Sequence, residues 1–582
     1  MIYKYDRNED HGTAEASAFV TYDPNSIQNG GRIGDVVTAL LTSQSFPLYL
    51  DPSGLRPDIV NNGFITKRDA LVQGHSVTAT WQATDNLTVK NLFAYRSGHL
   101  FSPDALDGLS TLVFTPQVAD ALAAFQAQAG AAAGAFPAAA IPLVTAQIRA
   151  GLAPSVGGRF ALITAQAASD SKQWSDELQV NFHTDKLQLT AGAMWFHSKD
   201  HSGSPLGMAA NPTSLDGNII PASGVVPLFA KQGQFTNTAT SLAAYLQAEY
   251  NITPQLSLIA GGRITYDKKG STFAFGPLNS LQTITPPLYK KTKPNWLVGI
   301  NYKPSDDILL YAKYSTSFVS GGSTVGVEYA PEEAKSVEAG IKADLLDKHL
   351  RVNLAAFHVN YTHYQSAQGT SQQQSALLLI AAATPLYGAT IATTLASALS
   401  TFNFDAGTLR AQGIEADVTA APVRGVTMGG TLGYTDTKFT QLSPIVLATN
   451  NPEGTGGQYN TINRPKWTAT LWGQYETQPL FGDATFMIRA DGAYKSKELL
   501  NTYQWPSTSV LSQLNSVPAY WVINGRAALR HINVGGAKAE VAVWAKNLTD
   551  QKQRNFALVQ PFVTGINFIP ARTYGFDLSI EF

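Results

Sequence analysis

The chain has 582 residues, which is enough for one very large domain or several ordinary ones. Charged residues make up only 14% of it, against roughly 25% in a soluble globular domain, while aromatic residues reach 10%. The net charge of -1 argues against a basic nucleic-acid-binding protein. Because cysteine is absent, disulfides, thiolate catalysis and cysteine-ligated metals are excluded.

The chain begins with MIYKYDRNED, which contains no apolar run of the kind that a signal peptide needs. Beyond it, strict alternation of apolar and polar residues is the strongest signal. In the stretches 76–83, 336–345, 426–435 and 574–582 every second residue is apolar or glycine, and the last row ends on Phe582. Alternation of this kind predicts strands with one apolar and one polar face.

About eighteen such segments occur, many of them about 10–14 residues long, which suits tilted membrane-spanning strands better than soluble ones. In chain order the predicted strands are 1–8, 74–83, 86–97, 173–184, 186–198, 237–251, 254–268, 292–303, 307–318, 333–346, 349–365, 408–421, 425–440, 464–476, 481–498, 518–532, 537–549 and 570–582.

One predicted strand breaks the alternation. Around Ala355 and Ala356 the phase slips, so that Phe357, Val359 and Tyr361 leave the apolar row. A bulge would explain this change, and so would aromatic side chains on the inner face.

The connections between the predicted strands alternate between short and long. Short turns include 84–85, 347–348, 423–424 and 533–536, and long loops include 98–172, 199–236, 269–291, 366–407 and 441–463. Short turns on one rim and long loops on the other are typical of an outer-membrane barrel. Since backbone groups in lipid all need partners, spanning strands should close into a barrel.

Two of the long loops are expected to contain helical insertions. The stretch Ser375–Leu399 carries no charge, but Pro385 and Gly388 interrupt it, so a helical or hairpin insertion near 366–407 is favoured over a transmembrane helix. The alanine-rich run Ala121–Ala153 predicts a helix in the loop 98–172.

Outward aromatic residues are predicted to form two girdles at the membrane interfaces, although chance placement of a tyrosine-rich composition is the simpler alternative. Near the short turns these are Trp81, Tyr250, Tyr302, Tyr475 and Phe582. Near the long loops they are Tyr95, Trp195, Tyr266, Trp296, Tyr314, Tyr434 and Trp467.

The polar rows should line the lumen, and their charged members are the candidates for substrate contact. For each of them a solvated position or an ion pair in the wall is the simpler interpretation. They are Arg263, Lys313, Glu338, Lys342, Glu415, Asp417, Arg489, Asp491, Lys495, Arg526 and Arg530.

Signals for catalysis or metal binding are weak. His197 and His201 stand four residues apart at the expected start of a loop, whereas a metal pair with this spacing needs a helix, and no third ligand follows. No zincin motif, phosphate loop or nucleophile elbow is present, so we expect no metal, no cofactor and no enzymatic activity. A phospholipase-type barrel would need a Ser–His pair on the lipid face, and no outward histidine is expected to face a serine.

Several segments, taken in order, resemble TonB-dependent outer-membrane receptors. The segments GHSVTATWQATDNLTVKNLFAYRSG, YAKYSTSFVSGG, PEEAKSVEAGIKADLLDKHLRVNLAAFHVNYTHYQ, GIEADVTAAPVRGVTMGGTLGYTDTKFT, KNLTDQKQ and PARTYGFDLSIEF are similar to successive barrel strands of that family. The resemblance implies an all-β, antiparallel transmembrane barrel of about 22 strands that a globular plug fills.

By this resemblance residues 1–582 form an N-terminally incomplete barrel, because the first strand matches roughly the fifth family strand. We therefore expect Met1 to be an internal residue of a longer gene, with the signal peptide, the plug and the TonB box missing. TonB would act only through that missing region. By resemblance Phe582 also serves as a barrel-assembly signal.

The implied function is uptake of an iron–siderophore complex, cobalamin or a carbohydrate through the outer membrane, in contact with its lipid. A plugless passive channel or a non-functional fragment is the alternative, and an outer-membrane enzyme is less favoured.

Overall fold

The computed structural model describes residues 1–12, 17–27, 30–50, 53–61, 68–105, 108–132, 134–204, 209–213, 233–275, 282–369, 373–399, 401–449, 461–500, 513–560 and 563–581. The predictions for Phe582 lie outside the described residues.

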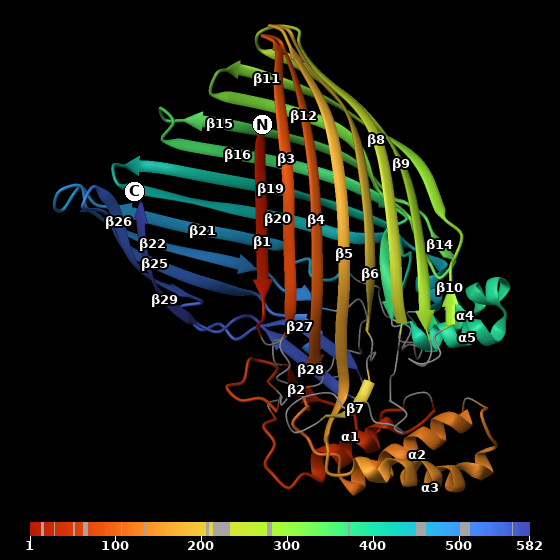
Figure 1. Ribbon diagram of the computed structural model, residues 1–582. Coiled ribbons are helices and arrows are strands. Elements are labelled where there is room, and N and C mark those ends of the chain that lie inside the picture. Colours follow the sequence, from red (N-terminus) through yellow and green to blue (C-terminus); the bar gives the residue numbers. More distant parts are fainter. Residues whose placement is uncertain are drawn as a thin grey trace.

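One 20-stranded sheet dominates the structure (Figure 1). Two of its strands, β7 (Ala209–Thr213) and β10 (Gln282–Ile284), are short additions, and removing these two from the 20 leaves 18 long strands. The long strands are β1 (Ile2–Asp10), β3 (Asp69–Thr84), β4 (Leu87–Ala105), β5 (Arg159–His183), β6 (Leu187–Ser204), β8 (Gly233–Asn251), β9 (Leu256–Phe275), β11 (Tyr289–Ser305), β12 (Ile308–Val319), β15 (Glu332–Leu345), β16 (Leu350–Thr362), β19 (Gly407–Val423), β20 (Val426–Leu442), β21 (Trp467–Glu476), β22 (Thr485–Lys495), β25 (Tyr520–Val534), β26 (Ala537–Lys546) and β29 (Thr573–Glu581).

Each long strand pairs antiparallel with the next one along the chain, which confirms the predicted antiparallel sheet. Among the described residues no ladder joins β1 to β29, so these two strands are the edges of the sheet.

The two rims of the sheet differ as predicted. Short turns join β3 to β4, β15 to β16 and β25 to β26 at one rim, and the long connections lie at the other, where helices gather (Figure 1). These helices are α1 (Ile33–Thr42), α2 (Pro116–Ala132), α3 (Ile141–Leu152), α4 (Gln373–Tyr387), α5 (Ala389–Ala398) and α6 (Pro444–Thr449), with 3-10 turns at Ala138–Ala140 and Ala153–Ser155. None of the helices in the described ranges is long and apolar enough to cross a membrane.

The sheet has one apolar face and one polar face. Directly opposite residues of paired strands share a face, and one continuous set contains Leu246, Ile264, Leu471 and Leu578. These four side chains are 52–62% exposed. Because protein does not cover this apolar surface, it needs a lipid environment.

Hydrogen bonds on the polar face show that this face is concave. The Tyr245 hydroxyl on β8 donates to Glu177 on β5 at 2.6 Å, although β6 lies between the two strands. Arg530 on β25 likewise reaches Glu476 on β21 at 3.1 Å across β22. Side chains two strands apart converge only on the inner side of a curved sheet, so the polar face lines a lumen.

The phase slip in β16 is resolved by its register. Pairing with β15 runs without a shift from Glu333 opposite Thr362 to Leu345 opposite Leu350. The predicted bulge is therefore wrong. The side chains of Phe357, Val359 and Tyr361 lie on the polar face instead.

Several strands extend further toward the loops than predicted. Strand β5 begins at Arg159 instead of 173, and β4 ends at Ala105 instead of 97. Above the apolar band both faces meet water, so the alternation that marks a strand in the sequence is lost there while backbone pairing continues.

Small sheets build up the loop rim. A three-stranded sheet joins β2 (Ala18–Thr21), β28 (Val563–Phe568) and β27 (Arg554–Gln560). The remaining pairs are β13 (Gly322–Thr324) with β14 (Val327–Tyr329), β17 (Gln365–Gly369) with β18 (Thr401–Asp405), and β23 (Glu498–Leu499) with β24 (Ser516–Val517).

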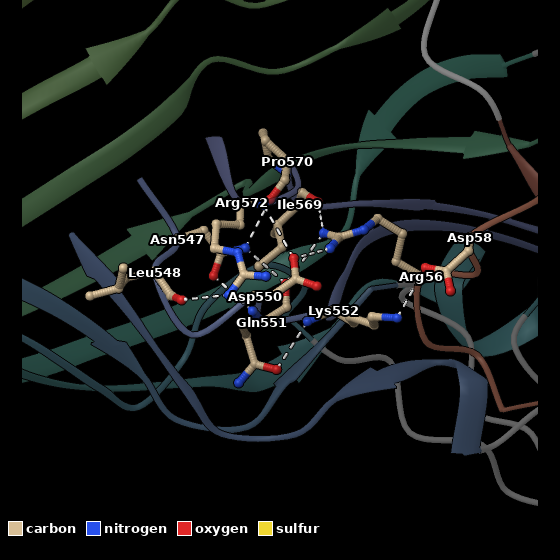
Figure 2. Close-up of polar contacts among 10 residues, drawn as sticks. All are labelled: Arg56, Asp58, Asn547, Leu548, Asp550, Gln551, Lys552, Ile569, Pro570 and Arg572. Atoms are coloured by element: carbon tan, nitrogen blue, oxygen red, sulfur yellow. Dashed lines mark hydrogen bonds and ion pairs between the residues drawn. The ribbon is translucent and has the colours of Figure 1, made fainter. Parts of the chain in front are cut away.

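A polar network ties the loop after β1 to the loop after β26 (Figure 2). Arg56 donates to the Asp550 carboxylate at 2.5 Å and to the Ile569 carbonyl at 3.1 Å. Lys552 contacts Asp58 at 3.2 Å. Since β2 also pairs with β28, these two loops connect the edge regions of the sheet at the loop rim.

Candidate ligand-binding site

The register places all eleven predicted lumen residues on the polar, concave face. They are Arg263, Lys313, Glu338, Lys342, Glu415, Asp417, Arg489, Asp491, Lys495, Arg526 and Arg530. Their contacts separate residues that hold the wall together from residues that remain available to a solute.

Arg526 and Arg530 belong to a continuous chain of ion pairs. Arg526 contacts Asp577 at 2.5 Å and Glu540 at 2.6 Å. Arg530 contacts the same Glu540 at 3.0 Å and Glu476 at 3.1 Å. These five side chains, which we call the ion ladder, connect β21, β25, β26 and β29, so the wall interpretation fits both arginines.

Other predicted residues also have partners in the wall. Lys313 pairs with Glu338 at 3.1 Å, and Lys495 pairs with Glu498 at 3.2 Å. Arg489 stacks over the Trp472 ring with its guanidinium 4.7 Å from the centroid. The remaining contacts are Arg263 over Tyr245 at 5.8 Å, Asn353 to Asp417 at 3.1 Å, and Asn524 to Asp491 at 2.8 Å.

A cavity of about 320 Å³ in the wall is lined by Lys342, Glu415, Tyr311 and Asp417 of the polar face, together with apolar residues such as Leu354 and Leu432. This cavity is smaller and lies further from the loops than the one described next.

A cavity of about 390 Å³, which we call the rim cavity, lies where the lumen meets the loops. Its wall comes from lumen-facing residues near the loop ends of β6, β8, β9 and β11, and its cover comes from β13, β14 and β18. Its lining includes Ser198, Asp200, Ser202, Phe235, Asn237, Lys269, Ser271, Tyr289, Ser323, Thr324, Tyr329, Phe402 and Asn403.

Lys269 fastens the cover of the rim cavity to the wall. Its ammonium group donates to the backbone carbonyls of Gly321 at 2.8 Å and Ser320 at 3.2 Å. Beside it Tyr289 is buried at 8% exposure, and Asp267 is buried to the same extent. One lysine thus holds the start of the loop 320–331 over the cavity.

The lining combines aromatic rings, hydroxyl and amide groups, one lysine and the carboxylate of Asp200. Such a mixture binds a polar solute that also has flat or apolar parts, and nothing in it suggests bond-breaking chemistry. The prediction missed this site, because Lys269, Asn237 and Ser323 meet only when loops fold back onto distant strands. The sole sequence signal was the length of those loops.

The histidines do not form a metal site within the described part of the chain, where no group of three metal-binding side chains occurs. The expected loop position of His197 and His201 is wrong, since both lie in β6 on the apolar face. Each contacts a threonine of β8 at 3.0 Å, Thr240 and Thr236 respectively.

Three more histidines lie on the apolar face, namely His75, His99 and His358. In the described pairs no serine lies directly opposite any of these five outward histidines. Their paired neighbours are Tyr5, Leu71, Tyr95, Asp170, Trp174, Thr236, Thr240, Val337 and Gln412.

The aromatic residues predicted at the interfaces all lie on the apolar face, apart from Phe582, which is not described. Toward the short turns are Trp81, Tyr250, Tyr302 and Tyr475, and toward the loops are Tyr95, Trp195, Tyr266, Trp296, Tyr314, Tyr434 and Trp467. Neighbouring rings stack, as Tyr434 and Trp467 do at 4.6 Å between centroids. Trp174, Tyr494 and Trp521 join the loop-side group and were not predicted.

A large antiparallel sheet with an exposed apolar convex face, a polar lumen and loops on one rim defines an outer-membrane β-barrel. Residues 4–548 match the family model "TonB dependent receptor-like, beta-barrel", and the chain therefore belongs to that family. This match confirms the predicted family and its outer-membrane location.

Curated relatives match only parts of the chain. The metal-pseudopaline receptor CntO of Pseudomonas aeruginosa is 26% identical over 181 residues, which cover 31% of this chain and 20% of the receptor. The ferrichrome outer membrane transporter/phage receptor of Escherichia coli is 25% identical over 262 residues, covering 44% of this chain and 28% of the transporter. The matches thus span less than a third of these relatives.

Solved structures share the fold over a longer range. The ferric-catecholate import receptor Fiu of E. coli superimposes with a TM-score of 0.61 at 13% identity, covering all of this chain and 71% of Fiu. The ferric yersiniabactin uptake receptor FyuA of Yersinia pestis gives 0.60 at 12% identity, covering 89% and 62% respectively.

Proposed function

We propose that the chain is the membrane-spanning part of a receptor that takes up a metal chelate, such as a ferric siderophore, across the outer membrane. The rim cavity carries this proposal, because it lies at the loop end of the lumen, where a solute from outside arrives first. The relatives are named as receptors or transporters for ferrichrome, ferric pyoverdine and metal-pseudopaline, and these names support the choice of substrate class. The proposal includes coupling to TonB, which the family match supports.

The chemistry of the rim cavity fits this substrate class. A metal chelate is a rounded molecule with polar donor atoms and often an aromatic or peptide part. The rings of Phe235, Tyr329 and Phe402 can contact the flat parts, while Asn237 and Asn403 offer amide donors and acceptors. The ion ladder leaves few free charges deeper in the wall, so recognition is proposed to occur at the rim.

Binding to purified chain in detergent tests the proposal. Ferrichrome, a ferric catecholate and ferric pyoverdine would be titrated by calorimetry, and one of the three is expected to bind. Ala239→Phe, which fills the rim cavity, should weaken that binding about tenfold or more, because a ligand loses its place. Ala493→Phe, on the lumen face of β22 and outside the cavity lining, is the matched control and should change affinity less than about twofold.

Equal losses in the two variants would contradict the site. Failure of every chelate to bind the folded barrel would contradict the substrate class. Hydrolysis of an ester substrate by the purified chain would instead point to the enzyme alternative.

A further inference from the structure

Among the described residues that line the rim cavity, Asp200 is the one carboxylate and Lys269 is the one cation. Asp200 is on the lumen face of β6, next in sequence to the outward Lys199. Its side chain forms no hydrogen bond or ion pair with any other described residue. The carboxylate is therefore available to a ligand in the cavity.

The lumen-facing neighbours of Asp200 are all uncharged. Directly opposite it are Ser171 on β5 and Asn237 on β8. Ser198 and Ser202 are the nearest inward residues before and after it in β6, and the inward residues diagonal to it on β5 and β8 are also neutral. Because no cation of the described wall lies beside it, Asp200 does not hold strands together as the carboxylates of the ion ladder do.

Several other carboxylates of the lumen face are bound by the protein. Glu177 accepts a hydrogen bond from the Tyr245 hydroxyl at 2.6 Å, and Glu249 accepts one from the Ser257 hydroxyl at 2.6 Å. These acids have a structural role in the wall. Asp200 has no such partner, so its charge is better explained by what enters the cavity.

Lys269 does not neutralise Asp200. Its ammonium group donates to the carbonyls of Gly321 and Ser320, and the buried Asp267 lies two residues before it on the same face of β9. The backbones of Asp200 and Lys269 are two strands and two residues apart, about 12 Å at ~4.8 Å per strand and ~3.4 Å per residue. The lysine is thus committed to the cover, and the free charge of the cavity is negative.

Aromatic rings complete the surroundings of the carboxylate. Phe235 is diagonal to Asp200 on β8, and its ring stacks on Phe273 with 4.4 Å between centroids. Tyr329 and Phe402 line the cover on the other side of the cavity. A carboxylate combined with aromatic faces is the set of groups that binds an ammonium ion, through a charge-assisted hydrogen bond and cation–π contacts.

We propose that Asp200 binds a protonated amine of the metal chelate, so that the rim cavity selects chelates with a pendant cationic arm. This inference rests on the proposed function. The cavity volume of about 390 Å³ is near the lower end of the roughly 300–1,000 Å³ found for small-molecule sites. It therefore suits one arm of a chelate, whose ammonium donates to Asp200 while its methylene groups contact Phe235 and Phe402.

Two ferric hydroxamate chelates test the proposal. Ferrioxamine B ends in a free ammonium group, whereas its cyclic counterpart ferrioxamine E has none. In calorimetric titrations of the purified full chain in neutral detergent at pH 7, ferrioxamine B is expected to bind about tenfold or more tightly than ferrioxamine E. Asp200→Asn keeps the shape of the side chain and should remove this difference by weakening ferrioxamine B alone.

The matched control is Glu249→Gln, which removes one negative charge from the lumen face near the short turns and should preserve the preference. An equal loss in this control would show that net charge attracts the amine and would overturn the site. Equal affinities for the two chelates in the wild type, or equal weakening of both by Asp200→Asn, would also overturn it.

The inference and the proposed function can fail separately. Binding of ferrichrome without binding of ferrioxamine B would contradict the cationic arm and leave chelate uptake standing. Failure of every chelate to bind the folded barrel would contradict both.

Discussion

Ile341 and Lys342 are consecutive in the chain, yet they lie on opposite faces of β15. Ile341 is paired with Leu310 and Leu354 on the apolar face, while Lys342 is paired with Leu309 and Asn353 on the polar face. One step along the backbone thus separates a lipid environment from the lumen, and this contrast can be measured.

Replacing Ile341 with arginine should destabilise the barrel by about 2–4 kcal/mol, because a guanidinium near the bilayer midplane is poorly solvated. Lys342→Ala should cost far less, since the lumen solvates either side chain. Reversible denaturant unfolding in lipid vesicles gives both values. Equal costs would show that the register of β15 is shifted by one residue.

Arg526→Ala should destabilise the barrel by roughly 1–2 kcal/mol, because it removes the central cation between Glu540 and Asp577 in the half-exposed ion ladder. Adding Glu540→Gln to this variant should cost less than it does in the wild type, since part of the interaction is already lost. Strictly additive costs in a double-mutant cycle would contradict the coupling.

Lys269→Met should loosen the cover of the rim cavity. The two carbonyls that the ammonium group binds, at Ser320 and Gly321, would lose their partner, at a cost of about 1–3 kcal/mol. Faster hydrogen exchange in 320–331 and weaker chelate binding are the expected results. Lys268→Met, one residue away on the opposite face, is the control for chelate binding and should change neither property.

Arg56→Ala should release the loop 547–572 from the loop after β1 (Figure 2). The backbone amide of Arg572 and the guanidinium of Arg56 hold the pKa of Asp550 below its ordinary value of 3.8. A lowered carboxyl pKa stabilises the fold above pH 3.8 and stops doing so as the pH falls through the folded pKa. Hydrogen exchange in this loop should therefore differ between variant and wild type at neutral pH, and the difference should shrink once the pH falls below 3.8 and through the lowered pKa of Asp550.

A difference that does not shrink at any pH below 3.8 would contradict the role of the Asp550 carboxylate. Lys552→Ala removes the neighbouring contact with Asp58, which is 90% exposed, and should have little effect at any pH.

The sequence predicts the barrel wall well because the lipid imposes a period of two on every strand it touches. Strands such as β15 and β20 were recognised nearly residue by residue for this reason. The predicted strands end too early at the loop ends of β4 and β5. These ends lie beyond the lipid, where water on both faces imposes no pattern on the side chains.

The structure of the loop rim could not be predicted from periodicity, for a different reason. Strand β2 pairs with β28 across more than 540 residues of sequence, as the bond from Ser17 to Asn567 with its separation of 550 shows. Short polar strands carry almost no local signal, and the rim cavity arises from such non-local neighbours. Pairing them requires the register of the entire wall.

The length of β5 has a consequence for how a solute enters. At ~3.3 Å per residue and a tilt of about 40°, its 25 residues rise about 60 Å, whereas an apolar band is only about 25 Å tall. More than half of this strand therefore extends beyond the membrane into water. On the side of β5 the wall of the lumen therefore extends well above the headgroups, so a dissolved molecule reaches it by diffusion through the aqueous layer and not by partitioning into the membrane.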